Sequence, residues 1–182
     1  MKSRPVEAEV PPGSRVAALL AGASFHDAWR ITSGDADLCA LGHFIAAARR
    51  TPSWVDACMT ARNRAGRLVG LKDLGTLSDV AADKPASAYR PGERVGIFTV
   101  FENTFDEALV GDRDKHLDVV LGIHRKPCTQ GGGGQAVVTV TTVVHVKNML
   151  GRIYMLPVRP MHRLIAPAVL SAIGHGARAG AA

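Results

Sequence analysis

The chain has 182 residues, of which 47% are hydrophobic and 21% are charged, so an extended fibrous or intrinsically disordered protein is excluded. This length predicts one domain with a substantial core over residues 14–176, between a flexible, proline-rich tail at 1–13 and a C-terminal tail at 177–182. No apolar run is long enough to cross a bilayer, and we expect no membrane partner.

The net charge of +6 is distributed unevenly along the chain. All 16 Asp and Glu residues lie at or before Asp118, so a carboxylate that acts as acid, base or ligand must come from the first two thirds. The basic residues are scattered and only 5% of the residues are aromatic, unlike the basic stripes with stacking platforms that bind nucleic acids. We therefore expect no nucleic-acid partner.

The three cysteines, Cys39, Cys58 and Cys128, are widely spaced and form no C-x-x-C pair. This pattern predicts reduced thiols in a cytoplasmic protein, without a disulfide framework or a zinc site. The apolar stretch that begins at Arg15 predicts a short helix over 14–20. A signal peptide is disfavoured because Glu7 and Glu9 precede this stretch and its apolar part is short.

A strand over 24–32 and two helices are predicted next. Asp35 or Asp37 is a suitable cap for the first helix, and its apolar residues recur at helical spacing up to Ala48. The second helix has Thr51 as its expected cap and ends at Gly70. Its apolar stripe consists of Trp54, Val55, Cys58, Ala61, Ala65 and Leu68.

Residues 72–92 show no sustained period and are expected to form a loop. From Glu93 onward the apolar period becomes two, which predicts antiparallel strands separated by short turns. The glycine run 131–134 is expected to be a hairpin loop, because a phosphate cradle would need a helix directly after it. The strands are predicted at 94–101, 107–112, 115–124 and 135–147.

A closing helix is predicted in two pieces, the first capped by Asn148 and running to Leu156, the second starting at Pro160. Pro167 should bend the second piece, which ends at Gly174 and Gly176. The order of elements predicts an α+β fold in which a long C-terminal helix grips a curved antiparallel sheet, with two helices after the first strand. A helix laid across the concave face of a sheet encloses a pocket for a small molecule.

Several motifs in combination resemble an uncharacterised bacterial family, catalogued as a domain of unknown function. Its members are similar to the START-like helix-grip (SRPBCC) superfamily, and some are fused behind a short-chain-dehydrogenase-like NAD(P)-binding domain. The resemblance implies a helix-grip fold over most of residues 14–173 and assigns no catalytic residue. Met161 departs from the aromatic residue expected there. The matching motifs are Thr51–Val55, Arg62–Asn63, Gly111–Asp118, Thr141–His145, Asn148–Tyr154 and Pro160–Ile165.

Three side chains are candidates for catalysis. His116 and Asp118 are two residues apart on a predicted strand and therefore share a face, where a carboxylate beside an imidazole gives a general base. The alternative is a solvated polar face that forms ion pairs. His145 ends a strand face that includes Thr141, and this face is either a pocket wall or a core face whose histidine binds a carbonyl.

Ligand contacts are predicted where the closing helix meets the sheet. Arg152 could hold an anionic group in a two-pronged contact, or pair with Asp114 or Asp118 and lock the helix onto the sheet. The other predicted ligand contacts are Tyr154, His162, Thr141 and Phe98, whereas Trp29, Trp54 and Phe101 are expected in the core.

No signature of a nucleotide, metal or hydrolase site is present, and no metal or cofactor is expected. Three functions remain open. The first is binding of a small, largely apolar or amphipathic ligand between sheet and closing helix. The second is an acid–base enzyme of the cyclase, hydratase or isomerase type. The third, from the fusions in similar proteins, is an interaction module for an NAD(P)-dependent oxidoreductase.

Overall fold

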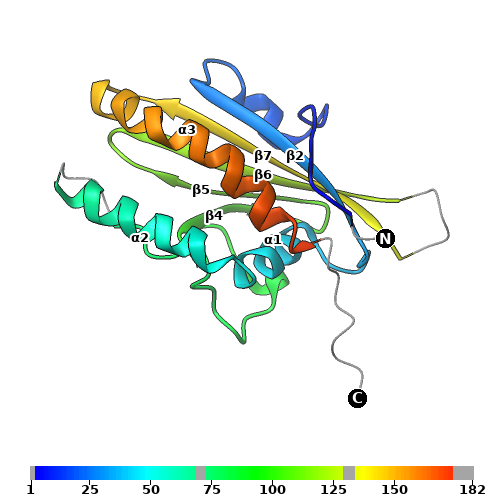
Figure 1. Cartoon of the computed structure of the whole chain (residues 1–182). Helices are drawn as coiled ribbons and strands as arrows, with labels where there is room; N and C mark the ends of the chain where they lie inside the picture. Colours follow the sequence, from blue (N-terminus) through cyan, green and yellow to red (C-terminus); the bar gives the residue numbers. More distant parts are fainter. Residues whose placement is uncertain (1–2, 69–72, 129–133, 174–182) are drawn as a thin grey trace.

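The computed structural model describes residues 3–68, 73–128 and 134–173 (Figure 1). Within these residues the chain has an α+β fold, as predicted, with a seven-stranded antiparallel sheet and three α-helices. The strands are β1 (Val6–Glu7), β2 (Phe25–Ser33), β3 (Arg94–Val95), β4 (Phe98–Asn103), β5 (Glu107–Arg113), β6 (Leu117–Pro127) and β7 (Ala136–Val146). The helices are η1 (Arg15–Leu19), α1 (Ala40–Arg49), α2 (Ser53–Leu68), η2 (Ala86–Ala88) and α3 (Met149–Leu170).

The strand order is β1-β2-β7-β6-β5-β4-β3, so β6 is the central strand. The N-terminal strand β2 pairs with the C-terminal strand β7 along its full length, from Phe25 opposite Val144 to Ser33 opposite Ala136. The first strand β1 lies within the segment predicted as a loose tail, and its Val6 pairs with Arg30. The predicted helix ends at Gly70 and Gly174, the glycines 131–133 and the tail 177–182 lie outside the described residues.

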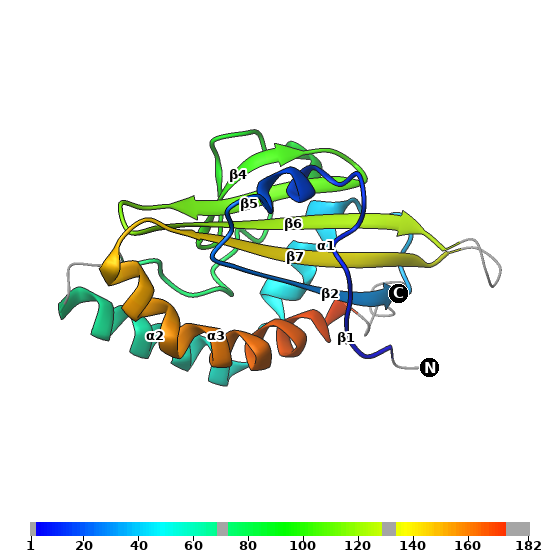
Figure 2. The same cartoon turned by 90° about the horizontal axis from the view of Figure 1, so that it is seen from above.

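The two faces of the sheet are covered by different elements. Helices α1, α2 and α3 lie on one face, and the short helix η1 lies on the other (Figure 2). Successive side chains of a strand point to opposite faces. In β7, Val138 and Val140 therefore pack on the helix-covered side with Ile123, whereas Val143 packs on the other side with Val16 of η1.

Close packing of η1 depends on a glycine in the central strand. A Cβ atom built on Gly122 would lie 2.5 Å from the Cβ of Val16, inside the normal contact distance. Val16 itself has no exposed surface. The missing side chain therefore lets η1 approach the sheet and fill this face near β5, β6 and β7.

Helix α3 is continuous from Met149 to Leu170, so the prediction of two separate pieces is wrong. Asn148 is its cap, as predicted, and accepts a hydrogen bond from the Gly151 amide at 3.1 Å. Pro157 and Pro160 are exposed on the side away from the sheet, where carbonyls that lose their helical partner can bind water. The helix can thus contain these two prolines without leaving buried carbonyls unsatisfied.

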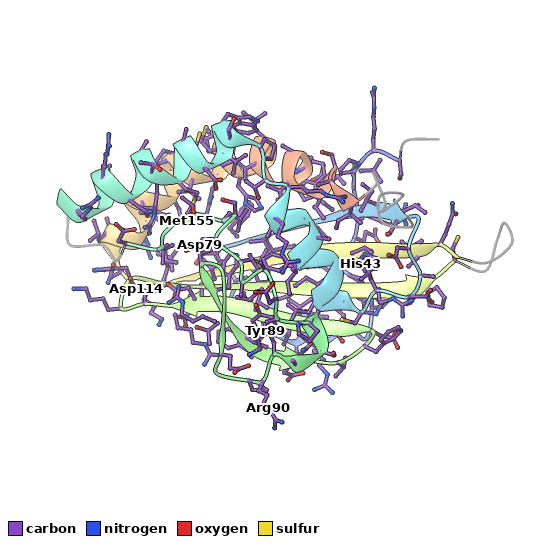
Figure 3. The ribbon with its side chains drawn as sticks, turned by 90° about the horizontal axis from the view of Figure 1, so that it is seen from below. His43, Asp79, Tyr89, Arg90, Asp114 and Met155 are labelled. Carbon is purple, nitrogen blue, oxygen red and sulfur yellow. The ribbon has the colours of Figure 1, made fainter. Side chains whose placement is uncertain are left out.

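The inner side of α3 faces the sheet, and its residues recur at intervals of three and four. Met155 is buried and points from α3 toward the sheet (Figure 3). A Cβ atom on Gly151 would lie 2.5 Å from the carbonyl oxygen of His116, so the first turn touches the backbone before β6. The outer side carries a second apolar row of Met149, Ile153, Leu156 and Leu164, each more than half exposed.

Two details of the first helices differ from the prediction. Cys39 precedes α1 at the cap position and makes no side-chain cap hydrogen bond, so neither Asp35 nor Asp37 is the cap. In α2, Val55 is buried but Trp54 is 43% exposed, so the prediction that Trp54 lies in the core is wrong. Among the described residues, no helix is both long enough and apolar enough to cross a membrane.

Candidate functional site

A polar cluster lies between strands β2 and β7 and the inner side of α3. The Nε2 atom of His162 lies 3.1 Å from Oδ1 of Asp27 and 3.2 Å from Oγ1 of Thr142. Trp29 donates its indole N–H to Oδ2 of Asp27 at 3.1 Å. The cluster therefore joins the last helix to two strands that are distant in sequence.

Asp27 is held in its charged form by these neighbours. Burial alone would raise the pKa of Asp27, but the hydrogen bond and charge of His162, with hydrogen bonds from Trp29 and Thr142, outweigh it and lower the pKa. The Phe25 ring meets the His162 ring edge to face, with centroids 5.7 Å apart. The imidazole is thus fixed by a carboxylate on one side and an aromatic ring on another.

The cluster stands beside apolar side chains that are only half-buried. Leu117, Val119 and Leu121 project from the central strand to the helix-covered face, yet each keeps accessible surface. On the same face, Ile123 is fully buried under α1. The sheet is therefore solidly covered at the α1 end and incompletely covered toward the start of α3.

Both sides of this region are apolar. Val158 and Ile165 flank His162 on the inner side of α3 and are also half-buried. A half-buried apolar face with one partly buried carboxylate–imidazole pair can hold an apolar molecule and orient it by few hydrogen bonds.

His116 and Asp118 do not form the predicted pair. His116 lies in the turn before β6, and its Nδ1 lies 3.0 Å from the side-chain amide nitrogen of Asn148 and 3.2 Å from the amide oxygen. Asp118 binds the Lys147 ammonium at 2.6 Å. Lys147, which precedes α3, thus makes an ion pair of the kind suggested for Arg152. The exposed side chain of Arg152 pairs with neither Asp114 nor Asp118 among the described residues.

His145 and Thr141 lie on the face of the sheet opposite α3. The Nε2 atom of His145 lies 2.9 Å from the carbonyl oxygen of Leu19, at the end of η1. Thr141 is buried on the same face. The prediction that these two residues lie under the closing helix is therefore wrong. For His145 the alternative prediction is confirmed, because its side chain is bonded to a backbone carbonyl.

Tyr154 and Phe98 have packing partners away from the cluster. The hydroxyl of Tyr154 accepts a hydrogen bond from Nε of Arg62 at 3.0 Å, and the guanidinium lies 5.3 Å from the ring centroid. This contact fastens α2 to α3. Phe98 packs on Phe44 of α1 with centroids 5.9 Å apart. Among the predicted site residues, His162 is the one that lies in the polar cluster.

Asp27 and Thr142 were not predicted as site residues, although the sequence contains a signal for Asp27. Phe25, Trp29 and Ile31 alternate along β2 and share the face that packs under the helices, and Asp27 belongs to the same alternation. A carboxylate on the buried face of a strand requires a polar partner. Thr142 has no such signal, because nearly every side chain of β7 is buried on one face or the other.

Two hollows on the surface of the described residues are lined by elements other than α3. One, of about 660 Å³, lies on the η1 side of the sheet beside the segment Ala8–Pro12. The other, of about 550 Å³, lies between α1 and η2. Within the described ranges, no group of three or more His, Cys, Asp or Glu side chains is arranged to hold a metal ion.

These features define a class of α+β domain in which an antiparallel sheet has three helices on one face and a carboxylate–imidazole pair under the last helix. Residues 19–169 match the family described as "Protein of unknown function (DUF2867)", and the chain belongs to this family. The match extends from the end of η1 through nearly all of α3, and the predicted membership of an uncharacterised family is confirmed. No curated protein and no solved structure matches the chain.

Proposed function

We propose that this protein is a START-like helix-grip domain that binds a small, largely apolar ligand between the sheet and α3. The supporting observation is the half-burial of Leu117, Val119 and Leu121 on the central strand, directly on the face that α3 crosses. Inward side chains at the centre of a helix-covered sheet are normally buried. Their remaining surface is the apolar area that a ligand would cover, at about 25 cal/mol for each Å² removed from water.

The polar cluster orients the ligand in this proposal. Both hydrogen bonds of the His162 side chain use Nε2, so Nδ1 has no partner among the described residues. Asp27 stays charged and fixes the imidazole. A hydroxyl or carbonyl group of an otherwise apolar ligand can then hydrogen-bond to Nδ1, in the manner of pockets that combine apolar walls with a few polar groups.

A second candidate function, acid–base catalysis on such a ligand, is favoured by the same pair. A carboxylate bonded to one imidazole nitrogen stabilises the protonated ring and leaves the other nitrogen to accept or return a proton. His162 and Asp27 take the role first considered for His116 with Asp118. This supports a reaction of the isomerase, hydratase or cyclase type, in which a proton is removed and replaced.

Native mass spectrometry of protein purified from its own host tests the binding proposal. The wild type is expected to retain a small molecule. Val119→Phe fills the face under α3 and should abolish retention, whereas Val6→Phe enlarges an exposed valine of the edge strand β1 and should not. Absence of a bound molecule in the wild type, or equal retention in both variants, would refute the proposal.

The catalytic candidate is tested with the retained molecule itself. Protein freed of ligand is incubated with the purified molecule in deuterated water, and exchange of its carbon-bound hydrogens is followed by mass spectrometry. Exchange should occur with the wild type and with Asp118→Asn, and should fall at least about 100-fold with Asp27→Asn. If the molecule binds but its hydrogens do not exchange, the catalytic candidate is refuted and the binding proposal stands.

A further inference from the structure

The hollow of about 660 Å³ lies on the opposite face of the sheet from α3, between the segment Ala8–Pro12 and strands β2, β7 and β6. We propose that it is a separate binding site for a small organic anion whose carboxylate or phosphate group is held by Arg30, Lys126, His124 and Thr139.

Sheet register brings these polar residues together. Arg30 of β2 is directly opposite Thr139 of β7, and Thr139 is directly opposite His124 of β6. Lys126 occupies the next position of β6 that points to the same face. The four side chains form a cluster across three adjacent strands, which is a rigid support for a ligand.

The cluster has an excess of positive charge. The side chains of Arg30 and Lys126 make no hydrogen bond or ion pair with the described residues, and Glu9 is the single carboxylate among the residues that line the hollow. A guanidinium and an ammonium that lack a protein carboxylate favour an anion between them, since charge-assisted hydrogen bonds are about twice as strong as neutral ones.

Thr139 indicates that the hollow is more than a charged surface. Its side chain is 6% exposed and lines the hollow, and its hydroxyl has no hydrogen-bond partner among the described residues. The residue lines the hollow, so its hydroxyl can donate to a ligand oxygen there.

His124 adds a second hydrogen-bond donor, and its pKa depends on the charges around it. Burial lowers the pKa of His124. Glu107 and Asp106 oppose this shift, whereas Lys126 adds to it. A bound anion would counteract Lys126 and stabilise the protonated ring, so it should raise this pKa.

The remaining wall is apolar and accommodates the organic part of the ligand. Val10, Pro11 and Pro12 form one side, and Pro127 with Val137 forms the other. The prolines have fixed backbone angles, so little conformational entropy is lost when the segment encloses a ligand. The chemistry of the hollow therefore fits a carboxylate or phosphate attached to a small apolar body.

NMR titration of the full chain with benzoate, phenyl phosphate and uncharged benzamide tests this inference. At least one of the two anions should give saturable shifts at Thr139 and His124 and raise the pKa of His124, and benzamide should bind at least about tenfold more weakly. The affinity should fall about tenfold in Arg30→Gln and in Lys126→Gln, and also in Thr139→Val, which keeps the side-chain shape.

Arg64→Gln, which removes an exposed cation of α2, is the matched control and should bind like the wild type. The inference is overturned if neither anion gives saturable shifts, if Arg64→Gln weakens binding as much as Arg30→Gln, or if the shifts map to α3. The last result would place the anion in the site beneath α3.

Discussion

Protonation of the buried His43 is expected to destabilise the fold as the pH falls below neutrality. The side chain lies on α1 and is 1% exposed, and its Nε2 has no hydrogen-bond partner among the described residues (Figure 3). Burial lowers the pKa of His43 from 6.5 to about 4, while Asp35 raises it and Arg125 lowers it by smaller amounts. The folded protein therefore favours the neutral ring.

The size of the effect follows from linkage. The unfolded chain binds the proton more tightly, so the stabilisation by the neutral ring is complete above pH 6.5 and is lost as the pH falls toward 4. At ~1.4 kcal/mol for each pKa unit, the shift from 6.5 to about 4 corresponds to a loss of roughly 3 kcal/mol in the free energy of unfolding.

Urea unfolding followed by circular dichroism, from neutral pH down to about pH 4.5, measures this loss. In His43→Leu, whose side chain has a similar volume and no proton to bind, the free energy of unfolding should depend much less on pH. His26→Gln, at an exposed position of β2, should retain the full dependence of the wild type. Equal pH dependence in His43→Leu and the wild type would refute the reasoning.

Two further predictions concern packing and capping. Gly122→Ala should lower the free energy of unfolding by about 1–3 kcal/mol, measured by urea unfolding, because its Cβ would lie 2.5 Å from that of Val16. Gly34→Ala, which has no atom within 4 Å of its Cβ, should have little effect, and equal losses would contradict the packing of η1. Asn148→Ala should lower the melting temperature through the loss of about 1 kcal/mol at the start of α3, whereas Asn148→Asp should retain the cap; equal losses would argue against capping.

Local patterns in the sequence were sufficient to predict much of the fold. The period of two predicted the main strands from β4 to β7, and the apolar spacing predicted that α1, α2 and α3 exist. Of the predicted caps, Asn148 of α3 is confirmed, whereas the Thr51 hydroxyl before α2 has no hydrogen-bond partner among the described residues. The prolines predicted that the last helix is interrupted. The free-energy cost of a proline inside a helix depends on whether the carbonyl that it leaves without a partner faces solvent. The side that faces solvent becomes known only when the helix is packed on the sheet.

The site was harder to predict because periodicity groups residues by face without showing which face a distant helix covers. In β7, Thr141 and Thr142 belong to opposite faces, and both are buried because η1 covers one and the helices cover the other. Choosing between them requires the long-range placement of η1. His116 illustrates a smaller error, since β6 begins at Leu117, two residues later than predicted, and the pair with Asp118 is lost.

Isotope-filtered NOE spectroscopy on protein that carries its retained ligand tests the central claim most directly. The ligand should show contacts to the methyl groups of Leu117, Val119 and Leu121 on the central strand and of Ile165 on α3. Ligand contacts confined to Val137 and Val143, on the face that η1 covers, would contradict a binding site beneath the last helix.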